Sequence, residues 1–372
     1  MGRPIDKITL TGFKSIRSLE NFELEPVNVL IGANGCGKSN FVSFFFLLRE
    51  IVEGRMETAV NKAGGADVFL FGGPKVTERI EARLEFGWNG YKFSLEPTAD
   101  NRLIFADERI EYHADPGMRT TSVDTSIGKG HSESKLKGHA RSGYNRQIAD
   151  YVFDAVSSWT VYHFHDTSER AAMRRRCSVR DNESLRPDAG NLAAFLYRLR
   201  DEEEETYALI CDSVRLVAPF FQDFKLRPKK KGEDRYLELE WEQKGSDYPF
   251  HPSQLSDGTL RFIALATALL QPTPPRTVLI DEPELGLHPQ ALDVLANLIL
   301  QAQERTQLIV STQSAALLNA FEPEQIVVID REDGESRFRR LDARDLKAWL
   351  EQDYTLGELW QKNVYGGEPM DE

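Results

Sequence analysis

The feature that most constrains the fold of this chain is a glycine-rich loop set between an apolar strand and an apolar helix. The loop, Gly32–Ser39, fits the pattern G-x-x-x-x-G-K-[ST]. β-Branched residues at 27–31 precede it, and the apolar run Phe41–Leu48 follows it. Glycines let backbone N–H groups turn toward phosphate oxygens, and the helix N-terminus adds a positive dipole end. The loop therefore predicts a phosphate-binding unit of an α/β fold.

Each polar residue of this loop has an expected contact. We expect Lys38 to reach the β- and γ-phosphates of ATP and the Ser39 hydroxyl to ligate Mg²⁺. A chance glycine-rich turn is the alternative, and four fixed positions in the right context argue against it. The residues expected to contact the nucleotide here are Asn34, Gly35, Cys36, Gly37, Lys38, Ser39 and Asn40.

A carboxylate pair follows a second apolar strand. Residues 277–280 end in Asp281-Glu282, and the end of a parallel strand beside a phosphate loop is where Mg²⁺ and the attacking water belong. We expect Asp281 to hold the metal, directly or through water. We expect Glu282 to accept the proton of the attacking water or to orient it. Solvated loop charges are the alternative.

A third motif precedes the apolar helix at 260–270. Leu255–Thr259 reads Leu-Ser-Asp-Gly-Thr, and at this point the chain resembles the ABC ATPases, whose signature loop has this form and placement. The resemblance implies that Ser256, Gly258 and the helix dipole bind the γ-phosphate held by a second subunit, with Asp257 among the contacting residues. The bland alternative is a helix N-cap at Ser256. Glu284–Pro289, placed like a D-loop, favours the ABC interpretation.

The switch segment departs from the transporter-like pattern. Those ABC proteins usually carry a histidine that contacts the γ-phosphate, and Gln313 stands in its place. Glutamine can bond phosphate and water but cannot carry a proton, so hydrolysis is expected to be slow or regulated. The expected catalytic residues are therefore Glu282, Lys38 and Gln313. No Q-loop glutamine is identified; the loop at residues 64–73 occupies roughly that place.

The chain is similar to the SMC/RecF/OLD branch of these ATPases, and within it to compact bacterial RecF-like, AAA-type ATPases. The resemblance implies that Lys14 and Ser15 approach the nucleotide, that ATP closes a homodimer, and that a separate effector, a nuclease or toxin, is coupled to it. The segment after Gln313 has no Toprim-like acidic constellation, so any nuclease would be another polypeptide. The matching stretches are Phe13–Ile16, His163–Ser168, Leu185–Pro187, Asn191–Leu192, Leu255–Leu270, Asp281–Pro289, Thr312–Ser314 and Leu356–Trp360.

Composition narrows the function classes. The net charge of −13 argues against a surface that binds nucleic acid throughout. Two basic clusters, Arg174–Arg176 and the cluster of Lys225, Arg227 and Lys229–Lys231, stay candidates for a DNA track, with solubilising charges as the alternative. No run approaches the roughly 18 apolar residues of a membrane span. The N-terminus lacks the apolar core of a secretion signal. We expect a cytoplasmic protein without membrane contact.

His163, His165 and Asp166 form one more polar group. His-x-His places two rings on one side of a strand, as metal ligands require, but no fourth ligand is evident. Asp166-Thr167-Ser168 also suits a helix N-cap. We therefore favour a structural or interdomain role over a metal site.

The predicted organisation is a two-lobe ABC head. Its divisions are residues 1–113 (phosphate loop and an antiparallel sheet with hairpin turns at Asn89-Gly90 and Asp100-Asn101), 114–270 (mainly helical, ending in the signature loop) and 271–372 (carboxylate pair, D-loop and switch). Residues 115–144 are expected to be a flexible excursion. Two functions stay open: a nucleotide-gated sensor that drives a partner effector in defence or genome maintenance, and a repair or recombination ATPase acting directly on DNA.

Overall fold

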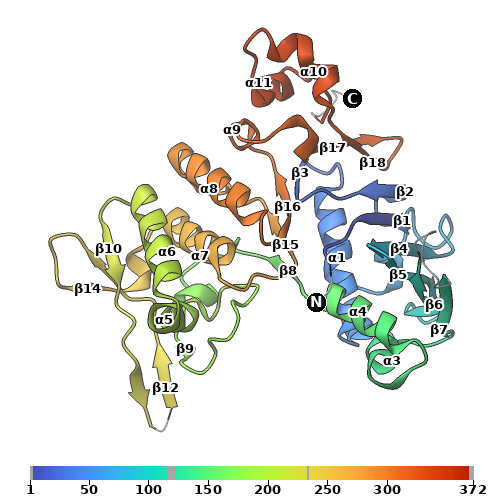
Figure 1. Cartoon of the computed structure of the whole chain (residues 1–372), viewed down its shortest axis with the longest axis horizontal. Helices are drawn as coiled ribbons and strands as arrows, with labels where there is room; N and C mark the ends of the chain where they lie inside the picture. The colour runs from blue at the N-terminus through green and yellow to red at the C-terminus, as the bar shows by residue number, and fades with distance from the viewer. Residues whose placement is uncertain (1–2, 115–121, 233, 368–372) are drawn as a thin grey trace.

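The computed structural model describes residues 3–114, 122–232 and 234–367. Within these ranges, two six-stranded sheets form the frame, one antiparallel and one mainly parallel. Helix α1 (Lys38–Val52) packs between them. Figure 1 shows this lobe beside a second, mainly helical lobe that contains α5, α6 and α7. The expected α/β class, with an antiparallel subdomain and a helical lobe, is confirmed.

The antiparallel sheet has the strand order β2-β1-β4-β5-β6-β7. In β4 every second side chain is buried, as one buried face requires. The first hairpin turn is Gly87–Trp88, not Asn89-Gly90, because Phe86 pairs with Asn89 and Gly87 supplies the positive φ of the turn. The strands are β1 (Lys7–Phe13), β2 (Ile16–Glu23), β4 (Ile80–Phe86), β5 (Asn89–Pro97), β6 (Leu103–Tyr112) and β7 (Val123–Gly128).

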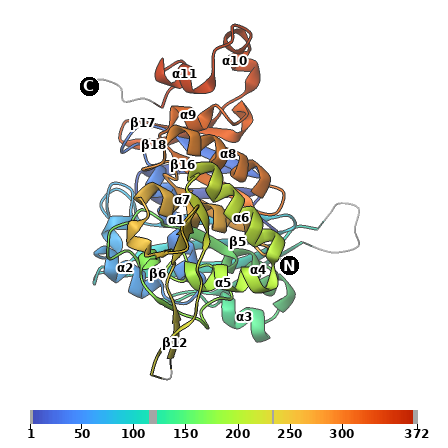
Figure 2. The ribbon, with the colours of Figure 1, turned by 90° about the vertical axis from the view of Figure 1, so that its left-hand side faces the viewer.

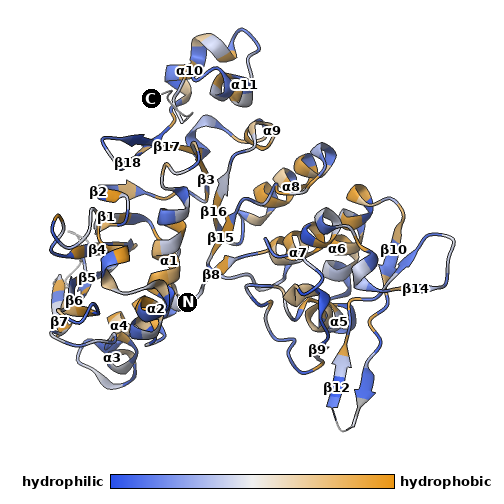
Figure 3. Cartoon of the chain, turned by 180° about the vertical axis from the view of Figure 1, so that it is seen from behind, coloured by the Kyte–Doolittle hydropathy of each residue, from blue (hydrophilic) through white to orange (hydrophobic). Residues whose placement is uncertain are grey.

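The central sheet has the order β18-β17-β3-β16-β15-β8, and all its pairs are parallel except that of β17 with β18. Both faces are covered, so β3 and β16 are buried along their whole length. Figure 3 shows apolar residues concentrated where α1, α7 and α8 meet this sheet. The strands are β3 (Val27–Ile31), β8 (Trp159–Tyr162), β15 (Thr277–Asp281), β16 (Gln307–Thr312), β17 (Ile326–Glu332) and β18 (Glu335–Arg340).

Aromatic side chains of α1 join the two sheets. Phe41, Phe44 and Phe45 are fully buried, and the ring of Phe45 lies 5.5 Å from that of Trp159 on β8. These contacts fix the direction in which α1 leaves the glycine-rich loop. The other helical segments of this lobe are α2 (Met56–Ala63), η1 (Ala66–Phe69), α3 (Leu136–Ser142) and α4 (Arg146–Ser157).

The segment expected to be a flexible excursion is mostly folded. Residues 115–121 lie outside the described residues, but strand β7 and helix α3 occupy much of the rest. Ile127 and Leu136 are buried, and the fully buried Glu108 carboxylate accepts bonds from the backbone N–H of Lys135 and the hydroxyl of Tyr91. A few apolar anchors and one buried carboxylate therefore order a segment whose composition suggested a loop.

The second lobe packs on the opposite face of the central sheet. Its core is built by α5 (Leu192–Glu202), α6 (Glu204–Val217), α7 (Asp257–Leu270) and α8 (Pro289–Ala302). A hairpin in which Lys229–Lys231 pair with Asp234–Tyr236 projects from the lobe (Figures 1 and 2). The short elements are η2 (Ala172–Arg174), β9 (Cys177–Ser178), β10 (Phe221–Phe224), β11 (Lys229–Lys231), β12 (Asp234–Leu237), β13 (Trp241–Gln243), β14 (Pro249–Phe250) and η3 (Pro252–Gln254).

Between β16 and β17 the chain forms α9 (Ala315–Leu318) and η4 (Pro323–Gln325), and after β18 it forms α10 (Ala343–Leu350) and α11 (Leu356–Gln361). No helix among the described residues is long and apolar enough to cross a bilayer.

The division of the chain at residues 114 and 271 remains a prediction. Helices α3 and α4 contribute Leu136 and Val152 to the core that contains α1 and the antiparallel sheet, and β8 lies in the central sheet. We therefore propose that the helical lobe begins after β8 rather than at residue 114.

Two adjacent phenylalanines of α1 test this packing. Phe45 is fully buried, whereas Phe46 is 47% exposed. Phe45→Ala should lower the free energy of unfolding by about 3–5 kcal/mol, because it leaves a cavity between the sheets. Phe46→Ala should change it by less than about 0.5 kcal/mol. Urea unfolding followed by circular dichroism measures both, and equal effects would contradict the packing described here.

Candidate nucleotide-binding site

Three parallel strands of the central sheet end level with one another. Strand β16 lies between β3 and β15, and the register pairs Thr312 with Ile31 and Ser311 with Asp281. The glycine-rich loop, the carboxylate pair and the switch segment leave the sheet at these ends. Because the carboxyl ends of parallel strands share one edge of the sheet, the three motifs meet at one site.

The glycine-rich loop is held tightly at its end. Gly37 has a φ of +117°, and a Cβ there would lie 2.0 Å from the Ser336 hydroxyl, so glycine is required. The buried Lys38 ammonium donates to the carbonyl oxygens of Gly32 and Ala33, the latter at 3.0 Å. The amine expected to contact phosphate therefore lies against the loop itself.

The remaining residues of the loop divide into exposed and buried ones. Asn34 and Gly35 are exposed, and so is Ser39 in the first turn of α1. Cys36 is buried, and burial raises the pKa of its thiol. The exposed residues are free to meet a ligand, whereas Cys36 packs beneath the loop.

A hairpin that the sequence did not indicate supports the loop from the side. The Arg331 guanidinium of β17 donates to the carbonyl of Gly35 at 2.9 Å. The hydroxyls of Ser336 on β18 and Ser15 lie 2.7 Å apart, and Asn40 donates to Ser15, also at 2.7 Å. Arg331 and Ser336 carry no recognisable motif, so only the fold reveals this contact.

An open pocket of about 620 Å³ lies beside the loop. It brings the predicted pair Lys14 and Ser15 next to Asn40 of α1. The Lys14 amine lies 5.5 Å from the centre of the Phe69 ring, and burial lowers its pKa. The pocket lies next to Asn40 in the first turn of α1 and has an apolar wall, as a nucleoside needs. Residues that line it are Lys14, Ser15, Asn40, Val68, Leu70, Phe71, Gly72, Arg331 and Gly334.

The loop at residues 64–73 belongs to this pocket and not to the carboxylate pair. The Phe71 N–H donates to the Gly12 carbonyl, and the Lys14 N–H to that of Phe69. The strand beside β15 on its outer side is β8, and pairing of Tyr162 with Ile280 places His163 level with Asp281. The segment that follows β8, and not the loop at residues 64–73, therefore has the position next to the carboxylate pair.

The carboxylate pair contains an unsatisfied oxygen. Asp281 Oδ1 and the neighbouring Ser311 hydroxyl are buried and have no hydrogen-bond partner. A buried carboxylate oxygen without a donor is destabilising unless a cation or water occupies its lone pairs. No group of three His, Cys, Asp or Glu residues that could hold a metal alone occurs in the described part of the chain. The donor set thus fits a Mg²⁺ ion that takes further oxygens from Ser39, water and phosphate.

Two carboxylates hold the switch residue. The Gln313 side-chain amide donates to Glu282 at 2.5 Å, and the Gln313 N–H donates to Glu284 at 2.7 Å. Burial raises the pKa of Glu284. Glu284 was assigned only to the D-loop segment, so its contact with the switch is new. Of the three predicted catalytic residues, Glu282 and Gln313 are in direct contact, whereas Lys38 bonds to the glycine-rich loop.

The signature segment begins α7 and touches the D-loop. The Ser256 hydroxyl accepts from the Thr259 N–H at 3.1 Å, which is a regular N-cap. A Cβ on Gly258 would lie 2.1 Å from the Gly286 carbonyl, so the first turn of α7 lies directly on that loop. The N-cap alternative thus describes the local geometry, and the role of the segment in nucleotide binding remains a prediction.

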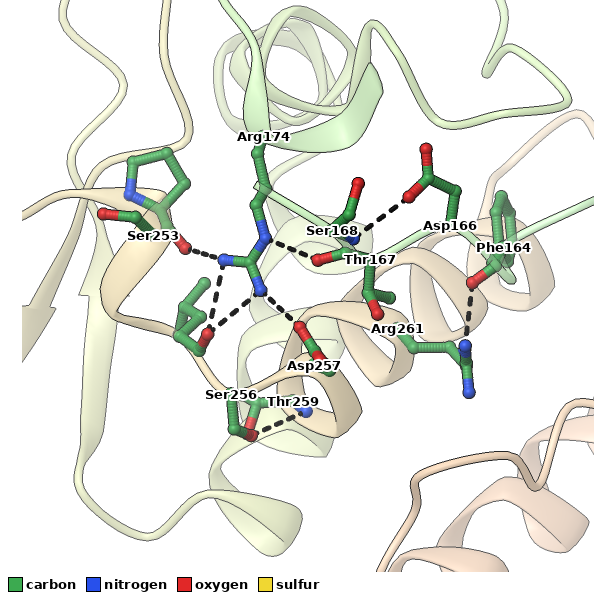
Figure 4. Close-up of polar contacts among 12 residues, drawn as sticks. Phe164, Asp166, Thr167, Ser168, Arg174, Ser253, Ser256, Asp257, Thr259 and Arg261 are labelled. Atoms are coloured by element: carbon green, nitrogen blue, oxygen red, sulfur yellow. Dashed lines mark hydrogen bonds and ion pairs between the residues drawn. The ribbon is translucent and has the colours of Figure 1, made fainter. Parts of the chain in front are cut away.

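Two arginines fix this segment to the irregular stretch that follows β8 (Figure 4). The buried Arg174 donates to the Thr167 and Leu255 carbonyls and to the Asp257 carboxylate. Arg261 donates to the carbonyl of His165 at 3.0 Å. The stretch at 163–168 therefore joins the sheet to the signature segment, in keeping with an interdomain role.

Fewer side chains of the two basic clusters are free to contact DNA than the sequence suggested. Arg174, expected to contact DNA or solvent, is buried, which corrects that expectation. Its exposed neighbours are Arg175 and Arg176. In the second cluster, Lys225 is paired with Glu242 at 2.6 Å and Lys229 with two glutamates. These ion pairs remove part of the positive charge a DNA track would need.

Comparison with known proteins agrees with this arrangement. Residues 27–319 match the family described as "AAA domain, putative AbiEii toxin, Type IV TA system". A crystal structure of an SMC head bound to the C-winged helix domain of ScpA is similar over 93% of this chain and 99% of that one, with 16% identity and a TM-score of 0.56. An Smc head from Pyrococcus furiosus, bound to the C-terminal domain of ScpA, is similar over 94% of this chain and 99% of that one. The sequence identity is 16% and the TM-score is 0.52. No curated protein sequence matches. The fold is thus that of an ABC-type P-loop ATPase head.

The close approach of α7 to the D-loop can be tested with an added methyl group. Gly258→Ala should lower the free energy of unfolding by about 1–3 kcal/mol, because backbone atoms must shift. Gly138→Ala, in helix α3 with open space around it, should instead raise it by roughly 0.5–1 kcal/mol. Chemical denaturation measures both, and stabilisation by both changes would contradict the contact.

The buried Glu284 gives a pH-dependent prediction. Because its pKa is raised on folding, its contribution to stability is full below the unfolded pKa and is lost as pH rises through the folded pKa. Glu284→Gln keeps an acceptor oxygen for the Gln313 N–H and removes the charge. It should raise the melting temperature relative to the parent at pH 8 but not at pH 4. An equal difference at both pH values would contradict the burial of this carboxylate.

Proposed function

The chain belongs to the family "AAA domain, putative AbiEii toxin, Type IV TA system", and from this we propose that it binds and hydrolyses ATP between two copies of itself. The class, an ATPase of the ABC/SMC-like P-loop type, follows from the family and the fold. Hydrolysis, the dimer and the coupling to an effector are our proposals.

The proposed nucleotide site has two parts in one subunit. The glycine-rich loop receives the phosphates, with Lys38 exchanging the Gly32 and Ala33 carbonyls for phosphate oxygens. The nucleoside lies in the pocket of Lys14, Ser15 and Asn40. This assignment is supported by two residues of the pocket: Asn40 follows the loop directly, and Arg331 donates to the Gly35 carbonyl.

The proposed metal ion is Mg²⁺, held by Ser39 and, directly or through water, by Asp281, whose unsatisfied oxygen favours a cation. The ion supplies charge neutralisation to the β- and γ-phosphates. Glu282 orients the attacking water and accepts its proton, and Gln313, bonded to Glu282, positions that carboxylate. Because Gln313 cannot relay a proton, turnover is slow or depends on a signal.

The single observation that carries the dimer proposal is the separation of the signature segment from the phosphate loop. Helix α7 packs on one face of the central sheet and α1, which begins at the phosphate loop, packs on the other. The Ser256 hydroxyl and Gly258 at the start of α7 are therefore available to a second subunit. There they complete the γ-phosphate site of the partner.

We further propose that this cycle gates a separate effector, a nuclease or toxin, in defence or genome maintenance. The family description, which refers to a toxin of a type IV system, supports the defence context. The place of the chain in the RecF/OLD branch is part of the same proposal. Direct action on DNA is the second candidate, and the buried Arg174 and the paired Lys225 and Lys229 weaken it.

Solution mass tests the dimer. With ATP and Mg²⁺, Glu282→Gln should form a stable dimer by light scattering, because the nucleotide is bound but its hydrolysis is slowed. Ser256→Arg should remain monomeric, since its side chain fills the surface offered to the partner phosphate. Binding of ATP to Ser256→Arg should persist, because its own phosphate loop is intact. A mass that stays unchanged in every state would refute the trans-completed site.

A further inference from the structure

The ion pair of Arg174 and Asp257 joins the short helix η2 to the first turn of α7. The Arg174 guanidinium and Asp257 Oδ1 lie 2.7 Å apart, and the side chain of Arg174 is 7% exposed while that of Asp257 is 67% exposed. A buried arginine thus reaches outward to an exposed carboxylate in the first turn of α7. Figure 4 shows Asp257 turned toward Arg174, while Ser256 bonds to Thr259 on the far side of that turn.

Asp257 presents a difficulty for the proposed function. A negative side chain suits a helix N-terminus, but this one stands between Ser256 and Gly258, the residues proposed to receive the partner's γ-phosphate. A carboxylate near a phosphate repels it, and the repulsion grows as a closing interface excludes water. The signature segment can bind phosphate only if this charge is neutralised or held aside.

The surroundings of Arg174 are suited to that task. Its remaining hydrogen bonds go to the carbonyl oxygens of Pro252, Leu255 and Thr167. Neutral acceptors leave its positive charge uncompensated except by Asp257. They also anchor the planar guanidinium, so the ion pair has one fixed direction.

We propose that Arg174 is a positioning residue that neutralises Asp257 and holds its carboxylate away from the phosphate-binding side of the signature segment. The proposal rests on the proposed function, since it requires a phosphate delivered by a second subunit. It goes beyond that function because it says that a signature segment containing an aspartate, Asp257, needs a buried arginine to neutralise it. A scaffold role, in which Arg174 only ties Thr167 to Leu255, is the alternative.

The test uses the full chain with Glu282→Gln as the parent and measures the dimer dissociation constant with ATP and Mg²⁺. Arg174→Met should weaken the dimer about tenfold, because an unpaired carboxylate then faces phosphate in a closed interface. Asp257→Asn alone should stay within about threefold of the parent. The double variant Arg174→Met/Asp257→Asn should recover to within about threefold of Asp257→Asn, because the charge to be neutralised is gone.

The variant Arg174→Lys distinguishes the two roles of Arg174, neutralising Asp257 and tying Thr167 to Leu255. Its result does not depend on whether Arg174→Met folds. Lysine keeps the positive charge but cannot reproduce the fork to the carbonyls. Dimerisation within about threefold of the parent supports the proposal, whereas a loss equal to that of Arg174→Met overturns it in favour of the scaffold. Failure of the double variant to recover, with an unchanged melting temperature, also overturns it. A parent that never dimerises overturns both this inference and the proposed function, whereas a dimerising parent with no rescue overturns this inference alone.

Discussion

Burial of both faces of the central sheet is the constraint on which the rest of the structure depends. Because α1 and the antiparallel sheet cover one face and α7 and α8 the other, β3, β16 and β15 are held in parallel register. Their ends are therefore level, and the glycine-rich loop, the carboxylate pair and the switch segment that follow them lie close together. A slip of one residue along β15 would invert its side chains and withdraw Asp281 from the site.

Polar contacts join the second lobe to this frame in addition to the apolar core that α7 and α8 share with the central sheet. The stretch after β8 gives its carbonyl oxygens to Arg174 and Arg261, and both guanidiniums also bind the start of α7 or the loop beside it. Such contacts are directional, so a shift of the strand end moves the signature segment. The geometry links the edge of the sheet, where His163 lies level with Asp281, to the signature segment.

The sequence predicted the parts of the site that lie at strand ends and failed where support comes from distant segments. Lys38, Glu282 and Gln313 were identified because each stands in a short motif after an apolar strand. Ser336 and Arg331 were not, since no motif marks a hairpin that happens to pass the phosphate loop.

Composition was a poorer guide than motif. Residues 122–142 contain few large apolar side chains, but Ile127, Leu136 and the buried Glu108 order them. Three consecutive arginines suggested an exposed basic surface, yet Arg174 is turned inward by carbonyl acceptors that only the fold assembles. Local charge does not tell which member of a run will be buried.

The burial of Cys36 beneath the phosphate loop lowers the reactivity of its thiol toward oxidants. The thiolate is the form that oxidants and thiol reagents attack, and burial raises the pKa of Cys36 as it does those of Cys177 and Cys211. At physiological pH all three sulfur atoms remain protonated and shielded. Peroxide that inactivates enzymes with exposed, acidic cysteines would therefore leave the phosphate loop of this protein chemically intact.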